Sequence, residues 1–186
     1  MTLDAFVPGN WEYAYGPAQL LSLVEQLNFP AIAANVYQTS NQKRPFLPYI
    51  IKEFNDLKVG IIGLTYPYVD KTMPDSFSEG FSFSLGLNEL PHLIDTLRSN
   101  EHVDLIVINS HLGLPLDVKL ASMVNDIDVI MSGHSHDRIE QPIMQNGCII
   151  VQAGSSGSFL GRLDLEVWNG KIKHFKHQLI PLFTDE

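Results

Sequence analysis

The chain has 186 residues, of which 45% are hydrophobic and 18% charged, and this balance predicts one folded domain with a sizeable core rather than a disordered chain. Twenty-one acidic residues against twelve basic ones leave a net charge of −9, which argues against a nucleic-acid-binding module because such modules need basic patches. The apolar runs are too short for a membrane-spanning helix, and the N-terminal residues do not have the pattern of a secretion signal.

The first half of the chain predicts one helix, one buried strand and one hairpin. Apolar residues recur at helical spacing over residues 17–28, and a proline begins that segment. Residues 31–37 form a short apolar run of the kind that builds buried strands. Residues 48–54 and 58–64 flank a turn-forming Asn-Asp pair, which predicts an antiparallel hairpin. The stretch 65–86 has no regular period, so we expect a long ordered loop there.

The second half alternates helices with short apolar strands. Asn88 is positioned to cap a helix that runs to about residue 99, and residues 103–109 follow as a buried strand of the parallel-sheet type. A second helix is expected over residues 116–124. Two more buried strands are expected at residues 128–131 and 148–153.

A hairpin near the C-terminus completes the predicted domain. Residues 160–167 alternate apolar and polar side chains, as a half-exposed strand does. Asn169-Gly170 then predicts a tight turn into a partner strand at residues 171–179. These elements predict a single α/β layered domain over residues 1–186, with both parallel and antiparallel strands.

Three histidines stand out because they follow predicted strands. His111 comes directly after one apolar run, and His134 and His136 lie in a Gly-His-Ser-His loop after another. In open α/β sheets the loops beyond the carboxyl ends of the strands meet at one crevice, so these two loops are expected to converge. The single cysteine, Cys148, excludes an internal disulfide and a thiolate zinc cluster. A metal here must therefore be held by His, Asn, Asp or Glu.

The His-x-His spacing favours a particular kind of metal site. Two imidazoles that diverge from one tight loop suit two neighbouring ions, and a two-metal site is a common way to activate water against a phosphoryl group. The alternative is a pair of buried structural histidines that bind backbone groups.

A loop near the N-terminus offers one more ligand. Asn10 follows a glycine and carries an amide oxygen that can bind a borderline cation, while Glu12 is positioned to orient neighbouring groups. The alternative is a plain turn, with Glu12 adding negative charge near a helix N-terminus.

Taken in order, these motifs resemble the calcineurin-like metallophosphoesterases, and within them the branch of the 5′-nucleotidases and 2′,3′-cyclic-nucleotide phosphodiesterases. The resemblance runs over nearly the whole chain. Its segments are Gly9-Asn10-x-Glu12, residues 29–36 (FPAIAANV), residues 58–65 (KVGIIGLT), residues 110–113 (SHLG), residues 133–136 (GHSH), and the pair QAG at 152–154 with LGRLDL at 160–165.

The resemblance implies a four-layer α-β-β-α sandwich with a two-metal site on the loops at the strand ends. By position, Asn10, His111 and His134 would bind one divalent ion, such as Mn, Zn or Fe, and His136 would bind the second. In this family the remaining ligands come from Asp-x-His and Gly-Asp motifs that precede the Gly-Asn motif. This sequence does not contain them, so we expect an N-terminally incomplete domain that holds at most one ion well. The family's C-terminal substrate domain is also outside the sequence.

One position departs from the nucleotidase pattern. Where the nucleotidases have Gly-Asn-His-Glu, with the histidine placed to stabilise the transition state or protonate the leaving group, this chain has Trp11. An indole N–H donates a hydrogen bond but cannot transfer a proton at neutral pH. A tryptophan here resembles the sulfur-oxidation thiosulfohydrolases (SoxB-like), whose substrate is a protein-bound thiosulfonate, whereas residues 110–113 have the nucleotidase form.

Three functions therefore stay open. The first is metal-dependent hydrolysis of phosphate esters, nucleotides above all, by a metal-activated water at a dinuclear site. The second is thiosulfohydrolase activity, and the third is a non-catalytic or incomplete fragment that acts with a partner segment. The expected partner is a small phosphoester molecule, and no catalytic residue is assigned. The resemblance implies a periplasmic or extracellular location, with a cytoplasmic one also open.

Overall fold

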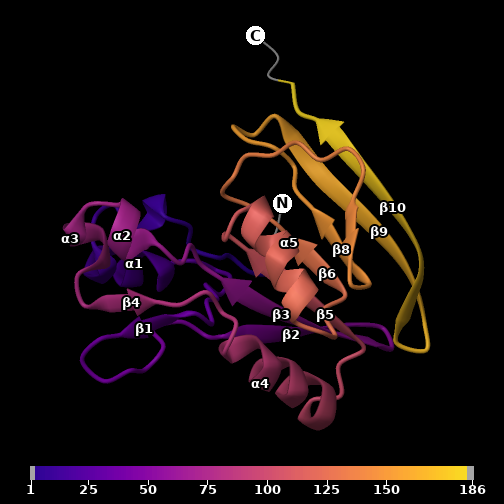
Figure 1. The fold of residues 1–186 in the computed structure, drawn as a ribbon, viewed down its shortest axis with the longest axis horizontal. Helices are drawn as coiled ribbons and strands as arrows, with labels where there is room; N and C mark the ends of the chain where they lie inside the picture. The colour runs from indigo at the N-terminus through magenta and orange to yellow at the C-terminus, as the bar shows by residue number, and fades with distance from the viewer. Residues whose placement is uncertain (1–2, 184–186) are drawn as a thin grey trace.

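The computed structural model describes residues 3–183, which are built around a six-stranded mixed sheet (Figure 1). The strands follow the spatial order β2-β3-β5-β6-β8-β7. Their bounds are β2 Tyr49–Phe54, β3 Leu57–Leu64, β5 Leu105–Ser110, β6 Val129–Met131, β7 Ile143–Gln145 and β8 Cys148–Val151. The inner strands β3, β5, β6 and β8 run parallel, and β2 and β7 are antiparallel to their neighbours. The mixed α/β class expected from the sequence is confirmed.

Two helices cover one face of this sheet. They are α4 (Glu89–Asp95), which continues as a π-helical stretch over Thr96–Asn100, and α5 (Leu114–Met123). The side chain of Asn88 makes no capping hydrogen bond to α4, contrary to expectation. The amide of Leu90 donates instead to the carbonyl of Gly86, at 3.0 Å. Within residues 3–183 no helix has the length and hydrophobicity that a membrane crossing requires.

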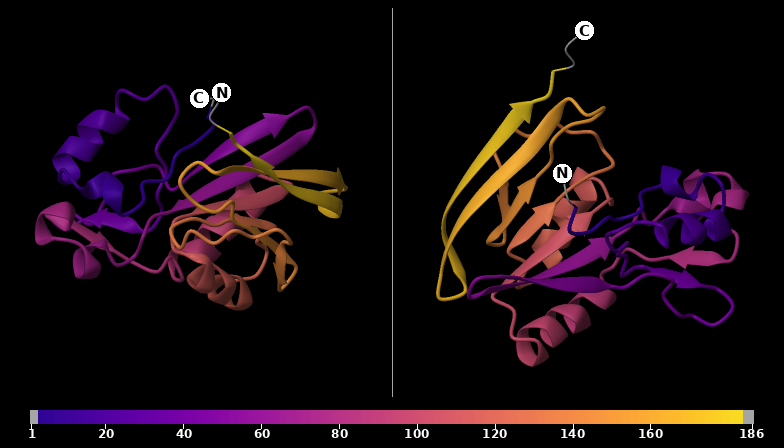
Figure 2. Two further views of the ribbon diagram at one scale, coloured as in Figure 1. Left: turned by 90° about the horizontal axis from the view of Figure 1, so that it is seen from above. Right: turned by 180° about the vertical axis from the view of Figure 1, so that it is seen from behind.

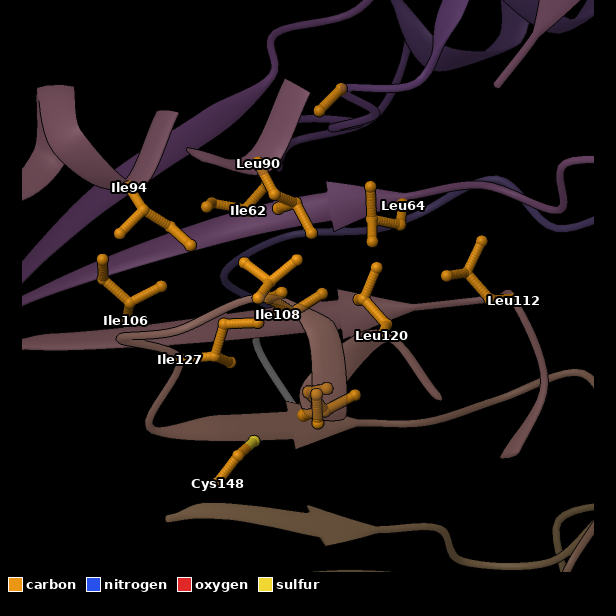
Figure 3. Close-up of a cluster of buried hydrophobic side chains, with 14 of the residues drawn as sticks. Ile62, Leu64, Leu90, Ile94, Ile106, Ile108, Leu112, Leu120, Ile127 and Cys148 are labelled. Carbon is orange, nitrogen blue, oxygen red and sulfur yellow. The ribbon is translucent and has the colours of Figure 1, made fainter. Parts of the chain in front are cut away.

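The main core fills the space between these helices and the sheet (Figure 3). Alternate residues of β3 and β5 point into it, as expected for strands whose side chains alternate between faces. Burial of so many aliphatic side chains supplies the main hydrophobic stabilisation of the domain. The members labelled in Figure 3 are Ile62, Leu64, Leu90, Ile94, Ile106, Ile108, Leu112, Leu120, Ile127 and Cys148.

A long hairpin crosses the opposite face of the sheet and forms a third layer. It consists of β9 (Phe159–Trp168) and β10 (Lys171–Pro181), which pair antiparallel as the sequence predicted. Figure 2 shows the hairpin standing across one end of the sheet only. A hollow of about 480 Å³ lies between the hairpin and strands β6 and β8, lined among others by Met131, Gln152 and Leu163. Two strands thus cover a six-stranded sheet incompletely.

A smaller lobe stands beyond the other end of the sheet (Figure 1). It contains a 3₁₀ turn (Trp11–Tyr13), α1 (Pro17–Val24), α2 (Val69–Thr72), α3 (Asp75–Ser78) and a two-stranded sheet of β1 (Val36–Gln38) and β4 (Phe81–Phe83). It has its own core, which comprises Tyr13, Leu20, Ala33, Val36, Phe46, Val69, Phe77 and Phe81.

Two expectations about this lobe were wrong. Residues 65–86 are not one loop, because α2, α3 and β4 lie within them. These elements are only one turn or three residues long, too short to leave a period in the sequence. Of residues 31–37, only Val36 and Tyr37 belong to a strand, and the preceding residues are buried in an irregular segment that makes isolated bridges.

That irregular segment passes very close to β3. A Cβ atom at Gly63 would lie 2.3 Å from the backbone oxygen of Ile32. The amide of Ala34 donates to the carbonyl of Gly63, at 2.8 Å. The absence of a side chain at Gly63 therefore lets the lobe dock against the end of β3 that carries the site residues.

Replacement of Gly63 by alanine should destabilise the protein by about 1–3 kcal/mol, because backbone rather than a movable side chain occupies the space. Gly60→Ala is the matched control, since the atoms nearest its Cβ are the methyl carbons of Leu97, at 3.0–3.1 Å, which can rotate away. Urea unfolding of both variants measures the difference, and equal losses would contradict this account.

Candidate metal centre

The carboxyl ends of all four parallel strands lie at one edge of the sheet, and each is followed by a residue of the candidate site. Tyr66 follows β3, His111 follows β5, His134 follows β6 and Gln152 follows β8. The parallel register aligns these ends, since Leu64 pairs with Ser110 and Asn109 pairs with Met131. Such an edge is where open α/β sheets bind their ligands.

Three of the predicted ligands meet there. The Oδ1 atom of Asn10 lies 3.3 Å from Nε2 of His111. Because an amide oxygen only accepts, Nε2 carries the proton of this hydrogen bond. The amide nitrogen of Asn10 is turned away toward the sulfur of Met73, at 3.7 Å. The ring of His134 meets that of His111 edge-on, with centroids 5.2 Å apart.

His136 lies on the same loop but is exposed. Both His134 and His136 adopt left-handed backbone conformations, with φ of 73° and 62°, which turn the chain sharply between them. A positive charge on His136 would lower the pKa of both His111 and His134, so the three imidazoles interact electrostatically. The structure thus groups Asn10, His111 and His134 closely and leaves His136 at the rim.

Two glycines allow the loops to approach His111. A Cβ atom at Gly9 would lie 2.5 Å from Nε2 of His111, and one at Gly133 would lie 3.4 Å from its Nδ1. A side chain at Gly9 would therefore displace the His111 ring. Space therefore requires the glycine of the Gly-Asn motif, whereas a Cβ atom at Gly133 would lie 3.1 Å from the backbone oxygen of Ser110 and would need only a small shift.

The histidines of the cluster favour their neutral form. Burial, with the nearby His134 and His136 as smaller causes, lowers the pKa of His111 to about 4. Burial also lowers the pKa of His134, with His136 as the second cause. Only a neutral imidazole has a lone pair for a metal, so this environment keeps His111 available as a ligand at neutral pH.

Polar side chains hold the Gly-His-Ser-His loop in shape. The side-chain oxygen of Gln152 accepts a hydrogen bond from the backbone amide of Asp137, at 2.6 Å. Ser135 accepts from the amide of Leu114 at the start of α5, at 2.9 Å, and donates to Asp137, at 2.6 Å. These bonds fix the loop to the strand that follows it and to the helix beside it.

Asp117 acts on His111 indirectly, through the neighbouring residue Ser110. It is fully buried, and its carboxylate accepts a hydrogen bond from Ser110, the residue before His111, at 2.6 Å. Burial raises the pKa of Asp117 to about 6, although the hydrogen bond from Ser110 and the nearby Ser132 hydroxyl act to lower it. Within residues 3–183 its other oxygen has no hydrogen-bond partner. Asp117 therefore positions the β5 terminus and does not itself reach the cluster.

The remaining two residues of the Gly-Asn motif have separate roles. Glu12 accepts a hydrogen bond from the backbone amide of Gly9, at 2.8 Å, and so closes the turn that carries Asn10. Trp11 is 68% exposed and packs edge-on against Phe77, with ring centroids 6.1 Å apart. Its indole lies on the surface beside Asn10.

The donors present fit one divalent ion in part. Asn10, His111 and His134 supply an amide oxygen and imidazole nitrogens, which suit Zn, Mn or Fe. All of these donors are neutral, and within residues 3–183 no group of three or more His, Cys, Asp or Glu side chains is arranged to hold a metal ion. A dinuclear site would need carboxylate ligands in addition to these residues.

Motif reasoning missed the supporting residues. Tyr66, whose ring stacks on that of His134 with centroids 4.1 Å apart, lies in a segment that the sequence predicted to be a long ordered loop. Asp117 gave one usable signal, a charged residue within the apolar stretch that forms α5. Gln152 gave another, because it directly follows an apolar strand at the same edge as the histidines.

Comparison with known proteins gives consistent relatives. No family model matches the chain. A 5′-nucleotidase of Vibrio parahaemolyticus is 32% identical over an alignment that covers 96% of this chain and 37% of that protein. The sulfate thiohydrolase SoxB of Thermus thermophilus matches with a TM-score of 0.91 and 31% identity, over 96% of this chain and 33% of SoxB.

A third similar protein is the calcineurin-like phosphoesterase YfkN of Bacillus subtilis, with a TM-score of 0.83 and 25% identity over 97% of this chain and 64% of that one. The chain spans less than two fifths of the length of the curated relatives it matches most strongly. Sequence and fold agree over nearly all of the chain itself. Over that length the chain is similar to the calcineurin-like metallophosphoesterases, and among them to 5′-nucleotidases.

Proposed function

We propose that this chain is part of a metal-dependent hydrolase that cleaves phosphate esters. The observation that carries the proposal is the convergence of Asn10, His111 and His134 at the carboxyl edge of the sheet. In this family divalent ions serve the reaction, and a bound ion lowers the pKa of water and so supplies a nucleophile at neutral pH.

In that reaction the chain's own residues would supply ligands for the ion and hold the loops that carry these ligands in place. The amide oxygen of Asn10 and the ring nitrogens of His111 and His134 offer neutral donors from three different loops. If Nε2 of His111 were to bind an ion, the neutral ring would carry its proton on Nδ1 instead, and the hydrogen bond to Asn10 would be given up. Gln152, Ser135 and Asp117 keep the loops fixed meanwhile, which limits the cost of reorganisation.

The substrate class that we propose is a nucleotide or a related small phosphoester. The names of the 5′-nucleotidase relatives support this class. The net charge of −9 also makes a nucleic-acid polymer a poor substrate. The periplasmic or extracellular location implied by the family stays a prediction.

We further propose that carboxylate ligands from polypeptide outside residues 1–186 complete the site, as the family resemblance implies. Two observations support this. The donors that converge here carry no negative charge, and a hollow of about 480 Å³ that reaches Ser132 and Gln152 lies under the hairpin. Sequencing of the coding region upstream of Met1 tests the idea directly, since Asp-x-His and Gly-Asp motifs should lie there in frame.

Thiosulfohydrolase activity is a second candidate, and Trp11 favours it. The similarity to SoxB, with a TM-score of 0.91, adds support. A thiolate leaving group needs no proton, so an indole in place of a histidine would cost little with such a substrate. Assays of the longer protein on nucleoside monophosphates and on a thiosulfonate conjugate, side by side, separate the two activities.

The 186-residue chain alone should bind no more than one divalent ion tightly. Asn10, His111 and His134 can gather around one ion, whereas the second position keeps only His136. Isothermal titration with Mn²⁺ or Zn²⁺ measures the number of sites. Two tight and equivalent sites would contradict the proposal that ligands are supplied from elsewhere.

Replacement of His134 by alanine should remove this ion and leave the fold intact, because the side chain lies on a loop and contributes little to either core. We expect the free energy of unfolding to change by less than about 1 kcal/mol. His136→Ala should leave the single ion bound, and His174→Ala, at an exposed position on β10, is the control. If His134→Ala unfolds the protein without changing its metal affinity, the histidine is a structural one.

Trp11 should make the completed enzyme a poor phosphomonoesterase on substrates with poor leaving groups. We expect weak hydrolysis of nucleoside monophosphates, appreciable hydrolysis of aryl phosphates, and a gain for Trp11→His on the nucleotides that approaches the roughly 10²-fold effect of a positioned general acid. Rates on a series of leaving groups measure the effect. An unmodified enzyme that already cleaves adenosine monophosphate at a rate Trp11→His does not improve would refute this role.

A further inference from the structure

The ring of His134 is held between two aromatic neighbours. Tyr66 stacks on one side, with centroids 4.1 Å apart and an angle of 28° between the ring planes, and His111 meets the ring edge-on. The backbone of His134 is left-handed, at φ 73°, in a loop whose next residue is exposed. A histidine in such a loop needs an external contact to keep one ring orientation.

Tyr66 is itself firmly anchored. The residue before it, Thr65, is fully buried, and both sides of its backbone are bound by the Asn35 side chain: the amide of Thr65 donates to Oδ1 of Asn35, at 2.8 Å, and Nδ2 donates back to the carbonyl of Thr65, at 2.9 Å. The ring of Tyr66 also packs against the core of the small lobe and meets Tyr68 edge-on, at 5.8 Å.

The Asn10 loop shares this anchor. The hydroxyl of Thr65 donates to the carbonyl of Pro8, at 2.5 Å, two residues before Asn10. The end of β3 therefore fixes the Asn10 loop through Thr65 and faces the His134 ring through Tyr66. It contacts the side chain of His134 and the backbone of the Asn10 loop without offering a ligand of its own.

We propose that Tyr66 is a positioning residue, whose ring holds the imidazole of His134 beside that of His111 so that both can bind one ion. The role rests on the proposed metal site. Orientation of a ligating histidine is often set by a hydrogen bond to its second nitrogen, and here the flat face of an aromatic ring does this work. The face of the ring matters and the hydroxyl does not.

The test compares three variants of the full 186-residue chain. Tyr66→Phe keeps the ring, Tyr66→Leu removes it, and Tyr49→Leu removes a half-buried tyrosine that packs against the main core on β2. In metal-free protein, NMR should show a contact between the His134 and His111 rings and a ring-current shift of the His134 ring protons. Both should persist in Tyr66→Phe and Tyr49→Leu and disappear in Tyr66→Leu.

Titration with Mn²⁺ or Zn²⁺ adds the second measurement. We expect Tyr66→Leu to bind about 10-fold more weakly than the unmodified chain, the usual lower bound for loss of an orienting neighbour, and Tyr66→Phe to bind as tightly as it does. If Tyr66→Leu does not fold, Tyr66→Met, which has similar bulk but no flat face, replaces it in both measurements.

The two measurements separate this inference from the proposed function. Retention of the histidine contact in Tyr66→Leu, or its loss with unchanged metal affinity, would overturn the positioning role. Failure of the unmodified chain to bind either ion would refute the metal site and with it the reason for the stack. The role is supported if Tyr66→Phe retains both the contact between the two histidine rings and the metal affinity, while Tyr66→Leu loses both.

Discussion

The buried hydrogen bonds between Asn35 and Thr65 are the constraint on which the arrangement of the site depends. The Asn35 side chain also donates to the carbonyl of Ser84, at 2.7 Å, so one amide group joins the segment before β1, the end of β3 and the chain after β4. Both residues are fully buried, and an unpaired polar group there would cost about 1–3 kcal/mol. These hydrogen bonds therefore hold the small lobe against the sheet at the end of β3, next to Tyr66 and the Asn10 loop.

The inner strands of the sheet could be predicted because most of their residues are buried and form apolar runs in the sequence. Residues 103–109 and 128–131 needed no other information, and the Asn55-Asp56 turn marked the β2–β3 hairpin. Residues 31–35 look similar in sequence but pair with no neighbouring strand along their length. The amides of Ile32, Ala33 and Ala34 bind three different partners, at Phe6, Leu47 and Gly63, and only the folded chain brings those carbonyls together.

The candidate site likewise contains residues that the sequence predicts and residues that only the structure reveals. Its donors could be proposed because a histidine or an asparagine beside a glycine has few common roles after a strand. Tyr66, Asp117 and Gln152 act through other residues, so their roles appear only when the loops are assembled. Tyr66 also lies in a stretch whose one-turn helices leave no period, and Trp11 was assigned from its motif although its ring turns toward Phe77 in the small lobe.

The electrostatics of the cluster supports the proposal that the converging donors are only part of a metal centre. Proximity of the imidazoles and burial both oppose a positive charge, which is why the pKa of His111 falls to about 4. A divalent ion at the same position meets the same loss of hydration, and neutral donors offset it only through their lone pairs. Asp117, the buried carboxylate behind β5, is committed to Ser110 and faces the strand end. The carboxylate ligands that we propose would offset the charge of the ion and would couple metal binding to the completion of the site.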